Sequence, residues 1–376
     1  MTGARAAMGL LALSVACSAS EEPGAFVAAS AREACAPLTL DEGPAPRWVD
    51  VPGAAPAELF VAGAQRAVAG ELAAPRRASA GVTRRFRPAF PLTPGLTYEV
   101  RRASCRASFR VPPLDGPAPQ VLAVHPRSAL LPENVLRFYV TFSEPMADAL
   151  TQDPIRLRRV SGEDLSGVFF RPSEALWSAD RRRLTLLVDP GRVKTGLRAH
   201  RTLGRAFVAG ERYRLEVRAG WPSLAGATLE APFVHHFRAA PEDRTRVDPE
   251  RWCLRTTEGP TGPQLRVHFR EPVDHGSVGR LLQLAHGRRI APGTWTLEAG
   301  DARATWVPSE ALAAPLREHR LLVDARFEDV AGNDIRAAFD HVVGEGSAAP
   351  GLVERPLDGV AADGEACDGW THEPRR

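Results

Sequence analysis

Apolar and polar residues alternate along several short stretches of this chain. In the segment 136–142, LRFYVTF, four apolar residues take every second position, with Arg, Tyr and Thr between them. A period of two places one face of a β-strand in a core and leaves the other face outside it. Glu144 and Pro145 follow, and proline ends the strand because it has no N–H to donate. The pattern therefore predicts a half-buried strand closed by a turn.

The same pattern recurs along the chain and divides it into modules. A chain of 376 residues is too long for one ordinary core. The 33 prolines and 32 glycines are spread along it, which is typical of short strands joined by turns. We predict an all-β protein with a small N-terminal β-sandwich at 34–113, modules at 121–239 and 252–343, and an irregular tail at 344–376. The predicted strands are 47–51, 58–62, 84–90, 97–101 and 104–111 in the first module, and 136–142, 155–160, 167–170, 183–188, 212–217 and 233–237 in the second.

The segment 189–208 is longer than a hairpin connection requires. Long loops on rigid scaffolds carry many binding sites, but they also simply cover the end of a core. We favour the covering role. An enzyme site formed by this insert is the least favoured alternative.

A repeat links the last two modules. The segment 265–272, LRVHFREP, repeats the pattern of 140–145, VTFSEP, and the segment 329–335, DVAGNDI, repeats that of 223–229, SLAGATL. Between them, 212–217 aligns with 319–324. The same three sequence motifs in the same order indicate two tandem copies of one fold.

These marks also carry a family resemblance. FSEPM at 142–146, a WxxD-like patch at 177–180, GxxYxLxV at 210–217 and DxAGN at 329–333 together resemble the bacterial Ig-like domain of surface-layer-type (SbsA-type) envelope proteins. The resemblance covers 121–343, and it departs from the pattern at Ala227 in the first copy and Arg270 in the second. It implies Ig-like antiparallel β-sandwiches that act, without catalysis, as spacers or adhesive modules on the cell envelope. It supplies no catalytic residues.

The N-terminus is typical of an export signal. Residues 1–17 contain an early charge, Arg5, then an apolar run, and end in Ser14-Val15-Ala16-Cys17. This run is too short for a permanent membrane span. Two interpretations of Cys17 remain open: a lipobox-like end that makes Cys17 the lipid-bearing first residue, or ordinary cleavage after Ala16. We favour a lipid anchor in the outer membrane with a flexible tether at 18–33, and hence an exported protein of the cell envelope.

Cysteine parity agrees with export. Without Cys17, an even set remains: Cys35, Cys105, Cys253 and Cys367. In an exported protein such a set predicts disulfides. Of the three possible connectivities, the local one pairs Cys35 with Cys105 and Cys253 with Cys367, and would staple the first and last modules. No two cysteines have the close spacing of a structural metal site.

The small net charge and the absence of known catalytic motifs argue against several classes of function. The formal net charge of +3 arises from 48 basic and 45 acidic residues, and gives no electrostatic case for nucleic acid. The sequence contains no HExxH, GxSxG, GxxxxGK or GxGxxG motif. We therefore predict a protein without catalytic residues or a cofactor. Its expected role is structural, adhesive or in assembly, with an envelope protein or a surface polymer as its partner.

Two alternatives concern ligands. Hard oxygen ligands around the DxAGN turn could hold calcium, although a tight turn favours the same residue types. For a glycan, Trp221 beside Pro222 in a predicted loop is the surface candidate. The calcium candidates are Asp324, Asp329, Asn333 and Asp334.

Overall fold

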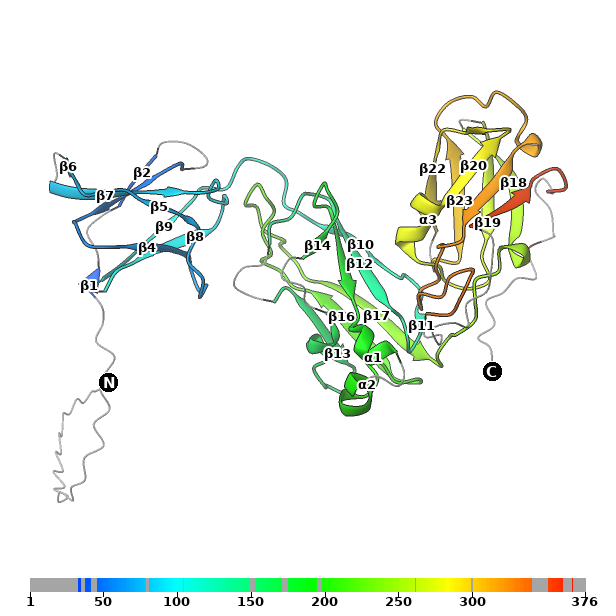
Figure 1. Cartoon of the computed structure of the whole chain (residues 1–376), viewed down its shortest axis with the longest axis horizontal. Coiled ribbons are helices and arrows are strands. Elements are labelled where there is room, and N and C mark those ends of the chain that lie inside the picture. The colour runs from blue at the N-terminus through cyan, green and yellow to red at the C-terminus, as the bar shows by residue number, and fades with distance from the viewer. Residues whose placement is uncertain are drawn as a thin grey trace, which may run out of the picture.

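The structure is a computed structural model, and three β-sandwiches follow one another along its longest axis (Figure 1). It describes residues 33–34, 38–41, 46–78, 81–103, 105–148, 153–170, 175–194, 198–260, 262–298, 300–339, 351–360 and 367. The export signal, Cys17, Cys35 and all but the last residue of the predicted tether lie outside the described residues.

The second module has the strand order of an Ig domain. One sheet runs β10–β12–β15–β14 and the other β11–β17–β16–β13. When the strands are lettered A to G in chain order, with β11 as A′, these sheets are the A-B-E-D and A′-G-F-C sheets of an Ig-like sandwich. The first strand of the second sheet, β11, pairs in parallel with the last, β17, and the other neighbours are antiparallel. The strands are β10 (Val121–His125), β11 (Leu130–Pro132), β12 (Arg137–Phe142), β13 (Ile155–Arg159), β14 (Leu176–Trp177), β15 (Arg183–Leu187), β16 (Arg212–Val217) and β17 (Phe233–Ala240).

The third module repeats the first of these sheets, whereas its second sheet has no counterpart of the parallel strand β11 and has an extra edge strand, β21, next to β20. Its sheets run β18–β19–β23–β22 and β21–β20–β24–β25. The last strand, β25, lies in the stretch predicted to be an irregular tail, and Leu357 just after it is buried in the module's core. That prediction is wrong for this strand, whose exposed, half-buried, exposed pattern marks it as an edge. The strands are β18 (Cys253–Gly259), β19 (Gly262–His268), β20 (Leu282–His286), β21 (Arg289–Ile290), β22 (Gly293–Leu297), β23 (Arg303–Pro308), β24 (Arg320–Asp324) and β25 (Leu352–Pro356).

The first module is a smaller sandwich. Its sheets run β1–β9–β8–β4 and β2–β3–β7–β5, and β6 also pairs with β7. All three modules are thus antiparallel β-sandwiches, and the predicted all-β, Ig-like fold class is confirmed. The strands are β1 (Glu33–Ala34), β2 (Thr39–Leu40), β3 (Val49–Pro52), β4 (Glu58–Val61), β5 (Gly70–Leu72), β6 (Arg76–Ala78), β7 (Gly81–Pro88), β8 (Thr97–Arg101) and β9 (Cys105–Arg110).

A tyrosine corner marks the F strand of the first two modules. The Tyr98 hydroxyl accepts a hydrogen bond from Thr93 N at 2.8 Å, and the Tyr213 hydroxyl accepts one from Val208 N at 2.8 Å. Such a tyrosine fixes the loop before the strand. In the third module His319 takes this place, buried, with its ring Nδ1 3.1 Å from the Pro315 carbonyl.

This corner corrects the predicted alignment of the repeat by one residue. Leu215 and Leu321 occupy the same core-facing position, because they pair with Leu157 and Leu284 of the neighbouring strands. The segment 212–217 therefore corresponds to 318–323, not to 319–324. A shift of one residue would turn every side chain to the wrong face of the sheet.

The long insert of the second module covers the end of its core. It forms two short helices, α1 (Pro190–Val193) and α2 (Arg198–Leu203), and Phe207 after them is fully buried. The strand predicted at 167–170 is mostly a 3-10 turn, η1 (Ser166–Val168), with one bridge from Phe169 to Val188. Two further 3-10 turns are η2 (Pro249–Arg251) and η3 (Leu316–Glu318), and one more helix is α3 (His275–Leu281). Within the described residues no helix has the length and apolar character of a membrane span.

Candidate functional site at the joint between the second and third modules

The turn at 329–333 of the third module, which we call the Val330 plug, inserts into the core of the second module. Val330 belongs to the apolar core of the second module, where it packs with residues such as Leu136. The Leu136 N–H donates to the Val330 carbonyl at 2.9 Å. Gly332 has φ +82°, and a Cβ there would lie 2.6 Å from a methyl carbon of Leu136. This close approach explains why the turn carries glycine.

The matching turn of the second module makes the joint with the first. Its Ala225 carbonyl accepts a hydrogen bond from Leu114 N at 2.7 Å. Gly226 and Gly95 have positive φ and touch backbone to backbone, so a Cβ on either would collide with the other turn. The equivalent turn of each copy, the one before its last strand, therefore forms a joint with the preceding module.

Buried ionic contacts surround the Val330 plug. Arg137 on β12 pairs with Glu328 at 2.7 Å and lies 3.5 Å from Asp274, which is 3% exposed. The Tyr139 hydroxyl donates to Asp274 Oδ1 at 2.7 Å. Burial raises the pKa of Tyr139, and the Asp274 carboxylate raises it further. Strand β12 thus presents its outward side chains to the third module and its inward side chains to its own core.

Imidazoles form a second contact region beside these ion pairs. His125 at the end of β10 places Nδ1 2.9 Å from Oδ1 of Asp301, and both side chains are buried. Asp301 also accepts a hydrogen bond from Arg127 N. The ring of His275 stacks on that of His125, with centroids 4.0 Å apart. Burial, with smaller contributions from the neighbouring His125 and Arg183, lowers the pKa of His275 to about 4. His275 is therefore neutral at pH 7.

The linker between the modules is held on both sides. Asn134 of the second module exchanges two hydrogen bonds with the backbone of Asp243, at 2.7 and 2.9 Å. Asn333 of the third module donates to the Asp243 carbonyl at 3.0 Å. Val247 and Trp252 farther along are buried in the core of the third module. The linker is thus a packed element and not a free tether.

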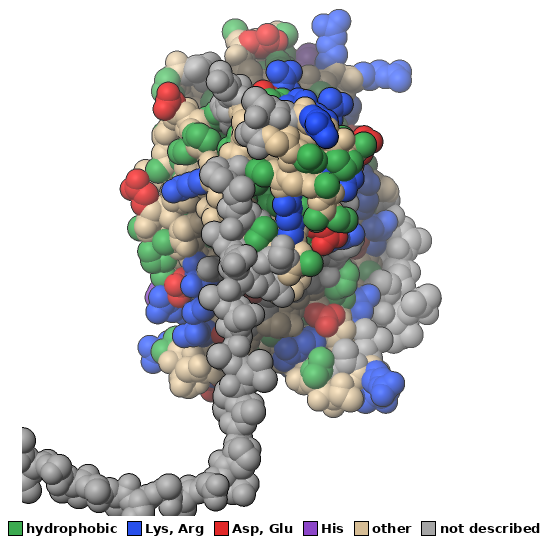
Figure 2. Space-filling model, turned by 90° about the vertical axis from the view of Figure 1, so that its left-hand side faces the viewer, with side chains coloured by type: hydrophobic (Ala, Val, Ile, Leu, Met, Phe, Trp, Pro, Cys, Tyr) green, Lys and Arg blue, Asp and Glu red, His purple; other side chains and the backbone are tan. Residues whose placement is uncertain are grey.

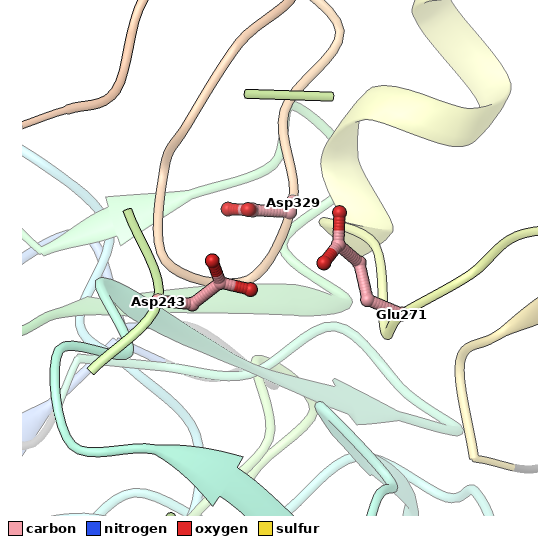
Figure 3. A group of neighbouring side chains, drawn as sticks. All are labelled: Asp243, Glu271 and Asp329. Carbon is pink, nitrogen blue, oxygen red and sulfur yellow. The ribbon is translucent and has the colours of Figure 1, made fainter. Parts of the chain in front are cut away.

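Three carboxylates lie close together where this linker meets the Val330 plug. The side chains of Asp243, Glu271 and Asp329 point toward one another (Figure 3), and an oxygen from each lies within 4.8 Å of the others. Asp329 accepts hydrogen bonds from Ala331 N, Asn333 N and Asn333 Nδ2 at 2.8–2.9 Å. Burial raises the pKa of Asp329 well above its ordinary value, and the Asp243 carboxylate adds to this.

Oxygen ligands at such separations suit a divalent cation such as Ca²⁺. However, the hydrogen bonds of the turn already account for the position of Asp329, so the cluster alone does not indicate a bound ion. The four predicted calcium ligands do not converge. Asp324 is paired with Arg326 at 2.8 Å, and Asp334 with Arg336 at 2.7 Å. Asp329 and Asn333 instead bond to each other.

The other sequence-predicted site residues fall elsewhere. The expectation that Trp221 is exposed is wrong, because its side chain is 5% exposed and its Nε1 donates to the Ala147 carbonyl at 2.9 Å. Cys253 and Cys367 are disulfide-bonded, with Cα atoms 6.1 Å apart. Cys105 is also disulfide-bonded. Its predicted partner Cys35 lies outside the described residues.

The strand order places the chain in the class of all-β proteins built from tandem Ig-like sandwiches. No family model matches the chain, and no curated protein matches it. Solved structures of other Ig-like proteins are similar to it at low identity. The N-terminal part of the bacterial S-layer protein SbsC is 14% identical with a TM-score of 0.24, and the match covers 66% of this chain and 45% of that chain, less than half of its length.

The titin domains I67–I69 are 10% identical with a TM-score of 0.17, over 77% of this chain and 87% of that one. The Escherichia coli adhesin FdeC is 11% identical with a TM-score of 0.18, over 84% and 92%. TM-scores this low carry no argument about function.

Proposed function

We propose that this chain is an exported, non-catalytic protein of the cell envelope, whose Ig-like modules form a stiff spacer that holds a surface away from a lipid anchor at Cys17. The joint between the second and third modules carries the proposal. A flexible array needs a solvated linker, whereas here a turn of one module is buried in the core of the next. Its partner would be an envelope protein or a surface polymer.

Several contacts act together to fix the angle between the modules. The plug at Val330, the Tyr139–Asp274 hydrogen bond and the His125–Asp301 pair lie on different elements of the third module. A hinge motion would have to break these contacts together and return the apolar surface around Val330 to water, which costs about 25 cal/mol for each Å² exposed. The two modules should therefore move as one body.

Small-angle X-ray scattering of the mature chain tests this stiffness. We expect a distance distribution with the maximum dimension of an extended three-module rod, the same at low and high salt. The variant Asp274→Ala with Asp301→Ala removes two of the buried carboxylates at the joint and should broaden the distribution. A wild-type profile as broad as that of the variant would contradict a stiff spacer.

The anchor needs a separate measurement. The intact mass of the protein from native membranes, taken before and after reduction, should begin at Cys17 with added acyl chains and should rise by the mass of four hydrogens on reduction. An unmodified mass would make the protein a free exported one and would remove the anchor from the proposal. Stiffness would be unaffected by that result.

A further inference from the structure

A groove lies beside the joint and is bounded by both modules. It encloses about 620 Å³. Its floor is the outer face of a sheet of the second module, where Tyr139 of β12 is paired with Thr185 of β15, while Phe138, next to Tyr139 in β12, lies in the core. Its wall is helix α3 of the third module. Any ligand in the groove would contact both modules.

The groove is basic. Arg137, Arg183 and Arg280 line it, and no acidic side chain is among its described lining residues. Arg137 already pairs with carboxylates of the joint. Arg183 and Arg280 have no ion pair among the residues that the structure describes. The Arg183 guanidinium lies over the ring of Tyr139, 5.7 Å from its centroid.

This gathering of charge is local. At the opposite end of the molecule, formed by the first module, basic side chains are scattered among apolar and acidic ones (Figure 2). The positive charge in the groove is also felt by its neighbours, since Arg183 contributes to the lowered pKa of His275, after burial and His125. The net charge of the chain is only +3, so the basic character of the groove comes from where its arginines lie in the fold and not from an excess of basic residues in the sequence.

We propose that this groove binds an acidic polysaccharide, whose carboxylate groups are held by Arg183 from one side and Arg280 from the other. A guanidinium matches a carboxylate with two parallel hydrogen bonds, and such charge-assisted bonds are about twice as strong as neutral ones. Such a ligand fits the envelope role proposed above, and this proposal rests on that role only because a protein on the cell surface would encounter such a polymer.

The floor favours a sugar polymer over an acidic peptide. Strands β12 and β15, which form the floor, each have a hydrogen-bonded neighbour on both sides, so the floor offers no free main-chain row to which an extended peptide could pair, and on this side of the sheet only the two-residue strand β14 is an edge. Recognition must use side chains, and those available are guanidinium, phenol, hydroxyl and imidazole groups. Of the two rings that line the groove, Tyr139 is buried, and the half-buried His275 is the one that a sugar ring could contact. Gly279 on the wall has open space where a Cβ would be, which leaves the groove wide.

Binding to alginate, a polysaccharide with one carboxylate per sugar, tests the proposal on the mature chain with both disulfides intact. The double variant Arg183→Gln with Arg280→Gln should weaken binding at least tenfold at low salt. Its matched control is Arg212→Gln with Arg289→Gln, which removes one exposed arginine from each module outside the groove and should change the Kd less than twofold. Gly279→Leu fills the groove without changing charge and should also weaken binding at least tenfold.

The outcomes separate the possibilities. Neutral dextran should not bind. Equal weakening by the groove and control variants would show a diffuse charge effect and overturn the site. Tighter binding of poly-L-glutamate than of alginate, lost in the groove variants, would overturn the polysaccharide assignment in favour of an acidic peptide. Absence of alginate binding to the wild type would overturn the inference but leave the scattering and mass results, and hence the proposed spacer role, untouched.

Discussion

Val330 of the third module is buried in the core of the second, where its carbonyl accepts a hydrogen bond from the backbone of Leu136 at 2.9 Å. The two residues are far apart in the sequence, yet they share one apolar cluster. The second core is therefore incomplete without the third module, and the stability of each should depend on the other.

Gly332 tests this dependence. In Gly332→Ala the new methyl meets Leu136 at a distance that real Cβ atoms do not adopt, and the residue keeps a positive φ of 82°. Gly210→Ala is the control, since Gly210 has φ +89° and open space around it. Both variants carry the backbone cost of roughly 1 kcal/mol, but only Gly332→Ala adds overpacking, of about 1–3 kcal/mol. Urea unfolding should show this excess, and equal losses for the two variants would mean that the plug is loose.

The Tyr139–Asp274 contact should be measurable as a coupling between modules. Tyr139→Phe removes the hydrogen bond, and Asp274→Asn removes the charge that accepts it. A double-mutant cycle in unfolding free energy should give a coupling of about 1–2 kcal/mol, typical of a buried bond to a charged group. The pair Thr257 and Arg212, on separate modules outside the joint, provides a reference cycle that should couple by less than about 0.5 kcal/mol.

The fold class follows from local sequence because strand periodicity is local. Alternation over six or seven residues identifies β12, and β8 and β16 have the predicted limits. Turn chemistry was equally informative: the predicted equivalence of 223–229 and 329–335 agrees with two matching hydrogen bonds, from Leu224 N to the Pro145 carbonyl and from Val330 N to the Pro272 carbonyl.

The joint could not be predicted, because nothing local indicates which outward-facing side chains meet. His125 and Asp301 are 176 positions apart, and each alone is an ordinary polar residue at a strand end. The prediction that Trp221 is exposed is wrong because a residue in a loop can still have its side chain buried in the fold. His319 was missed as the counterpart of Tyr213, although alignment by core-facing positions instead of residue class would have found it.

The disulfide between Cys253 and Cys367 should be a large part of the stability of the third module. It joins residues 114 positions apart and pins the chain beyond β25 to strand β18. Restricting so long a loop in the unfolded chain is worth about 4–5 kcal/mol in the chain-entropy account. Cys253→Ser with Cys367→Ser should lower the free energy of unfolding by up to that amount, measured by denaturant unfolding without reductant. A loss under about 1 kcal/mol would show that the packing of β25 alone holds this end.

Acid should weaken the joint through His275. Burial lowers the pKa of His275 to about 4 in the folded protein, against an ordinary value of 6.5. The unfolded chain therefore binds a proton more readily between these values, and the stability from neutral His275 is complete above pH 6.5 and is lost as the pH falls toward 4. The buried Asp329 acts in the opposite direction, because its raised pKa favours the protonated folded form in acid.

A difference measurement isolates the imidazole from these opposing effects. Between pH 7 and pH 4.5 the wild type should lose about 2 kcal/mol more unfolding free energy than His275→Gln, which cannot take up the proton. His236→Gln changes an exposed imidazole of β17 and should keep the wild-type pH dependence. Parallel pH profiles for the wild type and His275→Gln would mean that His275 takes up a proton as readily in the folded protein as in the unfolded chain, and that it has no part in the acid sensitivity of the joint.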